Sequence, residues 1–246
     1  MSGSRPVVLV TGGARRIGAA IVARLHAAGY DIALHHRDSA AAAQALAARL
    51  GELRADSILL LRGDLADDAT APRLVAEVLA RRGRLDALVN NASAFFPTPL
   101  GAATPAMWDT LFASNARAPF FLAQAAAPAL RAAGGAIVNL ADVHGETPLR
   151  DHAPYSAAKA ALLMLTRALA LELAPEVRVN AIAPGAVLWP EQGKPPAERE
   201  ALLARTPLGR LGTPEEIAEA VRWLIQDATY LTGQTLRLDG GRSLAG

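Results

Sequence analysis

Short runs rich in valine, isoleucine and leucine alternate with longer alanine-rich stretches along the whole chain, and this alternation constrains the fold most. The short runs are typical of buried strands, and the stretches between them are long enough for helices. This order predicts a parallel sheet with helices on both faces. The expected strands are 7–10, 31–35, 57–61, 87–90, 136–140, 178–182 and 235–238. The expected helices are 17–28, 39–50, 69–82, 105–131, 155–173 and 214–225.

Composition narrows the classes of function. The 246 residues, 52% of them hydrophobic, suit a single domain over residues 1–246. The net charge is +2 and the charges are interspersed, so no basic stripe predicts a nucleic-acid partner. The chain has no cysteine, which excludes disulfides and thiolate metal sites, and we expect no metal. Without an apolar run of about 20 residues or an apolar leader, we expect no membrane partner and a cytoplasmic location.

A tyrosine and a lysine four residues apart, Tyr155 and Lys159, begin the helix expected after the fifth strand. Residues with this spacing share one face of a helix. An ammonium group beside a phenol favours the phenolate, so we expect a lowered pKa for Tyr155 and a role as general acid. Asp142 follows the same strand, and ligands of α/β sheets bind at strand ends. The competing interpretation is a solvated surface pair.

A glycine-containing loop, Thr11 to Gly18, joins the first strand to the first helix. Gly12 and Gly18 would allow a tight turn and a close approach of backbone to a pyrophosphate at the helix N-terminus. Arg16, Ile17 and Gly18 are therefore expected to contact a nucleotide. Arg16 could also reach an acceptor-rich part of a substrate. The alternative is a glycine turn that binds no ligand.

The end of the second strand should determine which nicotinamide cofactor binds, because an acid there binds a ribose hydroxyl and a cation binds a 2′-phosphate. Arg37 favours NADPH, whereas Asp38 could face the ribose instead. His36 is a further candidate for the phosphate, with packing or a surface position as the competing role. After the third strand, Asp64 and Leu65 are expected near the adenine, and helix capping by Asp64 is the alternative.

Residues 186–206 form the one irregular stretch, rich in proline, glutamate and glycine. Loops of this length in compact domains are usually functional or mobile. We expect a lid that closes over the substrate, and a surface excursion is the alternative.

Taken together, the motifs resemble those of the short-chain dehydrogenase/reductase family over essentially the whole chain. They are Thr11-Gly12-x-x-x-Arg16-x-Gly18, Asn90-Asn91-Ala92, Asn115, Tyr155-x-x-x-Lys159, Pro184-Gly185 and Asp239-Gly240-Gly241. The resemblance implies an α/β fold with a Rossmann-like, doubly wound, seven-stranded parallel sheet, a nicotinamide cofactor, and a dimer or tetramer built by helix pairing.

Several roles follow only from this resemblance. Asn91 and Ala92 would line the cofactor pocket, and Pro184 and Gly185 would contact the cofactor. Asn115 would order a water that links Lys159 to solvent, unless it satisfies helix backbone instead. The threonine customary after Pro184-Gly185 is replaced by Ala186, which weakens any expectation of carboxamide anchoring and lid closure.

Within that family the chain is most similar to the pteridine reductases. Asp142 replaces the usual serine, Arg16 replaces the middle glycine, and the loop after the fourth strand reads Asn91 to Leu100. The resemblance implies NADPH-dependent reduction of dihydropterins, with biopterin and dihydrofolate as further candidates, by a homotetramer. Asp142 and Tyr155 would supply the proton. A drifted, inactive Asp142 is the alternative.

Substrate contacts are expected from the loop after the fourth strand. Phe95 could stack on a flat pterin, Ser93 and Arg16 could supply polar contacts at its rim, and Phe96 is expected in the core. Two other functions remain open: an ordinary carbonyl reductase acting on a ketone or 3-oxoacyl substrate, and an NADP(H)-binding regulator without turnover.

Overall fold

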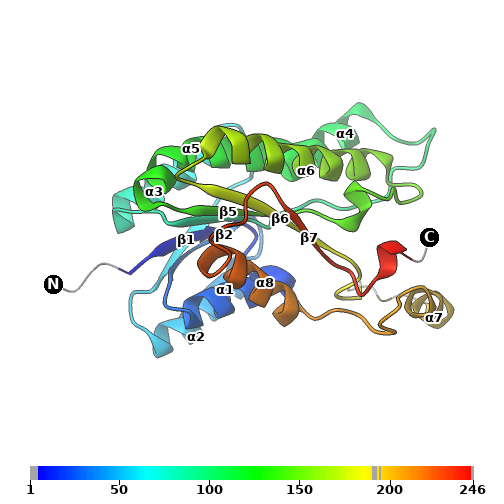
Figure 1. Cartoon of the computed structure of the whole chain (residues 1–246), viewed down its shortest axis with the longest axis horizontal. Helices are drawn as coiled ribbons and strands as arrows, with labels where there is room; N and C mark the ends of the chain where they lie inside the picture. Colours follow the sequence, from blue (N-terminus) through cyan, green and yellow to red (C-terminus); the bar gives the residue numbers. More distant parts are fainter. Residues whose placement is uncertain (1–4, 190–192, 194, 245–246) are drawn as a thin grey trace.

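The computed structural model describes residues 5–189, 193 and 195–244 and contains one seven-stranded sheet (Figure 1). Every strand pair is parallel, in the order β3-β2-β1-β4-β5-β6-β7. The strands are β1 (Val7–Val10), β2 (Asp31–His36), β3 (Ile58–Arg62), β4 (Ala87–Asn90), β5 (Ala136–Leu140), β6 (Arg178–Pro184) and β7 (Thr235–Leu238). The predicted fold class and all seven strands are confirmed, with small shifts at strand ends.

Helices cover both faces of the sheet (Figure 1). On one face lie α1 (Arg16–Ala27), α2 (Ala40–Leu53) and α8 (Pro214–Gln226), and on the other lie α3 (Thr70–Arg82), α5 (Ala118–Ala133) and α6 (Ala153–Leu173). Neighbouring strand residues point to opposite faces, so Val8 belongs to one core and Leu9 to the other. Burial on both faces explains why the strand sequences are continuous apolar runs rather than alternating ones.

Helix α8 begins with a complete capping box. Thr213 accepts from the Glu216 backbone N–H, and the Glu216 carboxylate accepts from the Thr213 N–H at 2.8 Å. Pro214 occupies the first turn, where its missing N–H costs no helical hydrogen bond.

The helix expected over 105–131 is not continuous. It consists of α4 (Pro105–Phe112), a π-helical turn (Ala113–Arg117) and α5. Pro119 lacks the N–H that would bond to the Asn115 carbonyl in a regular helix, and the Ala118 N–H bonds instead to Ala113 O. Single π-helical turns are frequent at functional sites.

The stretch predicted to be irregular also differs from expectation, because it contains the helix α7 (Pro196–Ala204). Proline at the first position and Glu198 in the first turn favour helix initiation. No residue of α7 is buried, and the helix lies at the periphery of the molecule (Figure 1). Residues 190–192 and 194 of the expected lid lie outside the described residues. No helix in the described part of the chain is long and apolar enough to span a bilayer.

A buried chain of polar side chains ties α6 to the middle of the sheet. Asn90 Nδ2 donates to Asn139 Oδ1 at 2.9 Å, and Asn139 Nδ2 donates to Thr166 Oγ1 at 2.9 Å. Thr166 Oγ1 then donates to Leu162 O at 2.8 Å. Since buried polar groups are costly when unpaired, this chain constrains how α6 sits on β4 and β5.

We expect Thr166→Val to lower the free energy of unfolding by about 1–3 kcal/mol, because the buried Asn139 amide loses its acceptor while side-chain shape is nearly kept. Urea denaturation measures the change. Thr110→Val is the matched control, since Thr110 Oγ1 also donates to a carbonyl four residues earlier at 2.8 Å but is exposed. A Thr166→Val protein as stable as this control would show that these hydrogen-bonded side chains do not stabilise the packing of α6 on the sheet.

Candidate active site and nucleotide-binding cavity

The predicted site residues follow the carboxyl ends of the strands and so meet at one edge of the sheet. Gly12 follows β1, Arg37 follows β2, Asp64 follows β3, Asn91 follows β4 and Asp142 follows β5.

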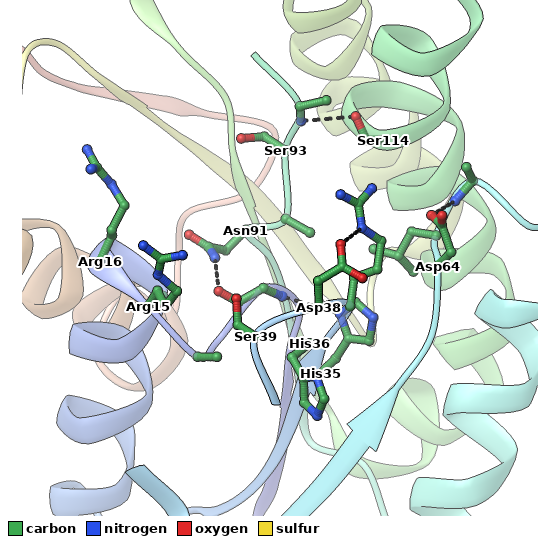
Figure 2. Close-up of a pocket in the computed structure, with 18 of the residues that line it drawn as sticks. Arg15, Arg16, His35, His36, Asp38, Ser39, Asp64, Asn91, Ser93 and Ser114 are labelled. Atoms are coloured by element: carbon green, nitrogen blue, oxygen red, sulfur yellow. Dashed lines mark hydrogen bonds and ion pairs between the residues drawn. The ribbon is translucent and has the colours of Figure 1, made fainter. Parts of the chain in front are cut away.

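A cavity of about 490 Å³ opens at this edge (Figure 2). Eleven of the predicted binding residues line it: Gly12, Arg16, Ile17, Gly18, His36, Arg37, Asp64, Leu65, Asn91, Ala92 and Ser93. The other nine lining residues are Ala14, Arg15, His35, Asp38, Ser39, Ala66, Ala94, Thr110 and Ser114, of which Asp38 was considered above as an alternative ribose contact. Most of these are close in sequence to predicted residues, including Ser114, which is adjacent to Asn115. Only Thr110 of α4 had no nearby motif that could have indicated it. The predicted residues that do not line this cavity are Phe95, Asn115, Asp142, Tyr155, Lys159, Pro184 and Gly185.

The glycine loop packs too tightly for side chains at its key positions. Gly12 has φ +61°, in the left-handed region, and a Cβ on Gly18 would overlap the carbonyl oxygen of Gly12. Asn91 fastens the loop, since its Nδ2 donates to Thr11 O at 2.9 Å and to Gly12 O at 3.0 Å. Asn91 therefore both lines the cavity and holds the backbone that a nucleotide would approach.

Arg16 occupies a backbone conformation that favours glycine. Its φ is +52°, and a non-glycine residue in this region costs on the order of 1–3 kcal/mol. The glycine that the resemblance leads one to expect here would adopt this conformation without that cost. The Arg16 guanidinium donates to Trp189 O at 3.4 Å and therefore lies between the nucleotide loop and the segment after β6.

The two histidines at the end of β2 differ in environment. His35 Nδ1 accepts from the Gly12 N–H at 3.3 Å, and its Nε2 lies 3.1 Å from Gly63 O. Burial lowers the pKa of His35 to about 4, so the ring is neutral and acts as a packing residue. His36 is buried too, but its Nδ1 has no hydrogen-bond partner among the described residues.

The cavity therefore has the features that a nicotinamide dinucleotide requires. Glycine backbone at the N-terminus of α1 suits a pyrophosphate. Arg37 and His36 line the cavity at the end of β2, where a cation suits a ribose 2′-phosphate. Asp64 accepts from the Ala66 N–H at 2.9 Å, which is a turn contact rather than the helix cap considered above, and its carboxylate still lines the cavity.

The phenol and the carboxyl group expected to act together are in direct contact. Tyr155 Oη donates to Asp142 Oδ2 at 2.6 Å, while Asp142 Oδ1 accepts from the His144 N–H at 2.8 Å. Burial and the neighbouring Asp142 carboxylate raise the pKa of Tyr155 above its ordinary value. The expected lowering of the Tyr155 pKa by Lys159 is wrong, because burial and the Asp142 carboxylate both favour the neutral phenol.

The Lys159 ammonium lies over the face of the Tyr155 ring and donates its hydrogen bond elsewhere than to the Tyr155 hydroxyl. Its Nζ donates to Leu140 O at 2.8 Å and is 5.8 Å from the centroid of the Tyr155 ring. Burial lowers the pKa of Lys159 to about 8, and the Asp142 carboxylate opposes that shift. The ammonium is therefore available to attract negative charge that develops on Tyr155.

Asn115 sits on the π-helical turn and is buried. Its Nδ2 donates to Ala94 O and to Leu111 O, both at 2.9 Å. The bond to Leu111, in α4, is the hydrogen bond to helix backbone that was considered as the alternative role. Its Oδ1 has no hydrogen-bond partner in the described part of the chain, which leaves an acceptor for a water. The link from Lys159 to solvent stays a prediction.

Phe95 lies beside Tyr155 and is 56% exposed. Its ring meets the Tyr155 ring edge-on at a centroid distance of 4.8 Å and stacks on the His152 ring at 4.7 Å. His152 was not singled out from the sequence, since nothing in its local pattern indicates the stack. Phe96 is only half-buried, so its predicted core position is wrong.

Gly185 has a structural task. A Cβ there would approach the Asp239 backbone to 2.7 Å, while the Asp239 carboxylate accepts from the Gly241 and Ser243 N–H groups at 2.9 and 2.8 Å. The end of β6 is thereby packed against the turn after β7. The expected contacts of Pro184 and Gly185 with cofactor stay predictions.

Comparison with known proteins supports this architecture. The family model described as enoyl-(acyl carrier protein) reductase matches residues 12–243. Pteridine reductase 1 of Leishmania tarentolae is 37% identical over 284 aligned residues, covering 99% of this chain and 98% of that protein. A Streptomyces violaceoruber protein described as a ketoacyl reductase of the granaticin polyketide synthase is 38% identical, covering 97% and 96%. The 3-oxoacyl-(acyl-carrier-protein) reductase FabG of Staphylococcus aureus is 35% identical, covering 95% and 96%.

The lowered pKa of Lys159 predicts a specific pH dependence of stability. Between pH 8 and 10.5 the unfolded chain holds a proton on this amine that the folded chain has released. Stability rises with pH wherever the unfolded state binds more protons. We therefore expect the free energy of unfolding of the wild type, relative to Lys159→Met, to rise across this interval by up to about 3 kcal/mol. Urea denaturation at several pH values tests this, and a constant difference would contradict it.

Proposed function

Because the chain belongs to the short-chain dehydrogenase/reductase family and is therefore an oxidoreductase, we propose that it reduces dihydropterins to tetrahydropterins with NADPH. The observation that carries this proposal is the 2.6 Å hydrogen bond between Tyr155 and Asp142. A ring C=N bond needs a proton on nitrogen as well as hydride on carbon, and a carboxyl group beside the phenol suits this demand. The similarity to Pteridine reductase 1 supports the same substrate class.

Tyr155 would act as the immediate proton donor. Its raised pKa keeps the phenol protonated over the physiological range, so the proton is in place when substrate arrives. Lys159 would stabilise the phenolate left after transfer, because its ammonium lies 5.8 Å from the ring. Asp142 orients the hydroxyl and, when it carries a proton itself, would serve together with Tyr155 on the more oxidised pterin ring.

Family members use NAD(P)(H). When bound, the nicotinamide supplies hydride to the substrate carbon. In our proposal the chain holds the pyrophosphate at Gly12, Ile17 and Gly18. His36 and Arg37 hold the 2′-phosphate.

The remaining contacts concern the substrate. Phe95 would stack on the pterin with the ring face not covered by His152, and Ser93 and Arg16 would bond to its rim. The backbone strain at Arg16 supports a functional role, since glycine would relieve it. We further propose a cytoplasmic homotetramer, and a single domain in which the described residues of the expected 186–206 lid, including α7, cover the substrate.

A carbonyl reductase acting on 3-oxoacyl substrates is the second candidate. It is favoured by the relatives named as 3-oxoacyl-(acyl-carrier-protein) and ketoacyl reductases, whose identities are close to that of the pteridine reductase. The aspartate in place of the usual serine argues for pterins instead, because a serine suffices to position a carbonyl.

The substrate class is tested by following NADPH absorbance after addition of dihydrobiopterin, dihydrofolate or a 3-oxoacyl thioester. We expect oxidation with the pterin or folate. Turnover of the thioester alone would establish the second candidate. Binding of NADPH without turnover of any substrate would indicate the nucleotide-binding regulator.

For the proton donor, we expect Tyr155→Phe to lower kcat on dihydrobiopterin at least about 100-fold while the Kd for NADPH changes little, because the general acid is lost. Steady-state kinetics and fluorescence titration measure the two quantities. Tyr230→Phe is the matched control, since Tyr230 is fully exposed and should leave kcat unchanged.

The same assay distinguishes the role of Asp142. Asp142→Ser should lower pterin turnover if the carboxyl group contributes to proton delivery. An increase in thioester turnover with no pterin activity would instead assign the site to carbonyl reduction.

A further inference from the structure

We propose that Asp38 competes with the cofactor's 2′-phosphate for the guanidinium of Arg37, and that this competition lets the cavity accept NADH as well as NADPH. The inference rests on the cofactor part of the proposed function and adds a residue that sets cofactor selectivity. It does not depend on which substrate is reduced.

The two side chains form an ion pair at the rim of the cavity. Arg37 Nε donates to Asp38 Oδ2 at 2.7 Å, and both residues line the cavity. Figure 2 shows Asp38 in this lining. The side chains are 62% and 70% exposed, so the pair is held weakly and a ligand can separate it. A phosphate that takes the guanidinium must displace the carboxylate.

Arg37 is the one arginine or lysine among the described lining residues that follow β2 and β3. Arg15 and Arg16 are the remaining cations of the lining, and they belong to the start of α1. Arg62 and Arg73 lie nearby but do not line the cavity, and both donate to backbone carbonyls: Arg62 Nε to Arg37 O at 3.3 Å and Arg73 Nη2 to Arg62 O at 2.7 Å. A 2′-phosphate at the end of β2 therefore depends on Arg37.

Charge opposes the phosphate and favours the hydroxyl. Once Arg37 pairs with a 2′-phosphate, the Asp38 carboxylate stays on the adjacent residue and repels it. At such separations in water, the interaction of two unit charges changes an equilibrium constant about fivefold, and a phosphate carries more than one charge. NADH presents a 2′-hydroxyl in the same place, which can donate to Asp38. The same residue thus weakens one cofactor and assists the other.

Isothermal titration of NADP⁺ and NAD⁺, with no pterin present, tests this in the wild type, Asp38→Asn, Asp38→Ser and Asp38→Glu. We expect both neutral variants to bind NADP⁺ about tenfold more tightly and NAD⁺ equally or more weakly. Asp38→Glu should stay close to the wild type because it keeps the charge. Unchanged NADP⁺ affinity in both neutral variants, or equal changes for both cofactors, would overturn the proposal.

A second measurement tests the route through Arg37. In an Arg37→Ala background, Asp38→Asn should give a smaller gain in NADP⁺ affinity than in the wild type, because the repulsion between carboxylate and phosphate remains but there is no guanidinium to compete for. An undiminished gain would overturn competition for Arg37. A wild type that binds NAD⁺ only would instead contradict the proposed preference for NADPH, so the two failures are distinguishable.

Discussion

The proposed chemistry depends on the hydrogen bond from Tyr155 to Asp142. The packing of α6 against the sheet brings these two side chains together. Tyr155 comes from α6, and Asp142 comes from the turn after β5. The hydrogen-bonded side chains of Asn90, Asn139 and Thr166 hold α6 against the central strands. Close to the site, the hydrogen bond from Lys159 to Leu140 O holds α6 to β5 in the same way. A shift of α6 by even one ångström would break a 2.6 Å contact.

Burial shifts the pKa values of Tyr155 and Lys159 in opposite directions. Desolvation lowers the pKa of Lys159 and, with the Asp142 carboxylate, raises that of Tyr155. In the proposed mechanism, Tyr155 therefore keeps its proton until substrate takes it. The Lys159 ammonium lies near the ring without a hydrogen bond to the hydroxyl. In the proposed mechanism, negative charge forms on Tyr155 during transfer, and Lys159 would stabilise that state more than the neutral phenol, as catalysis requires.

At the other end of the cavity, backbone geometry and exposed charge determine what binds. The glycine loop is held by the side-chain amide of Asn91, and Arg16 keeps a left-handed conformation despite its cost. Arg37 and Asp38 carry opposite charges on adjacent residues, and their pairing opposes a phosphate at the place where a cation attracts it. In our proposal, selectivity for the cofactor is a small difference between two weak, solvent-screened interactions.

The sequence by itself determined the sheet, because continuous apolar runs are required when both faces of a strand are buried. It also placed the strand-end residues and the glycine loop, since these depend on local backbone rules. Only the tertiary structure decided what depends on distant neighbours: the raised pKa of Tyr155, the stack of Phe95 on His152, and the half-buried position of Phe96. Composition alone suggested an irregular segment where the structure has the helix α7. The π-helical turn at Asn115 was not predicted, because its cause, the missing N–H of Pro119, lies four residues further along the chain. Propensity and spacing describe single elements, whereas burial and contact are properties of the packed chain.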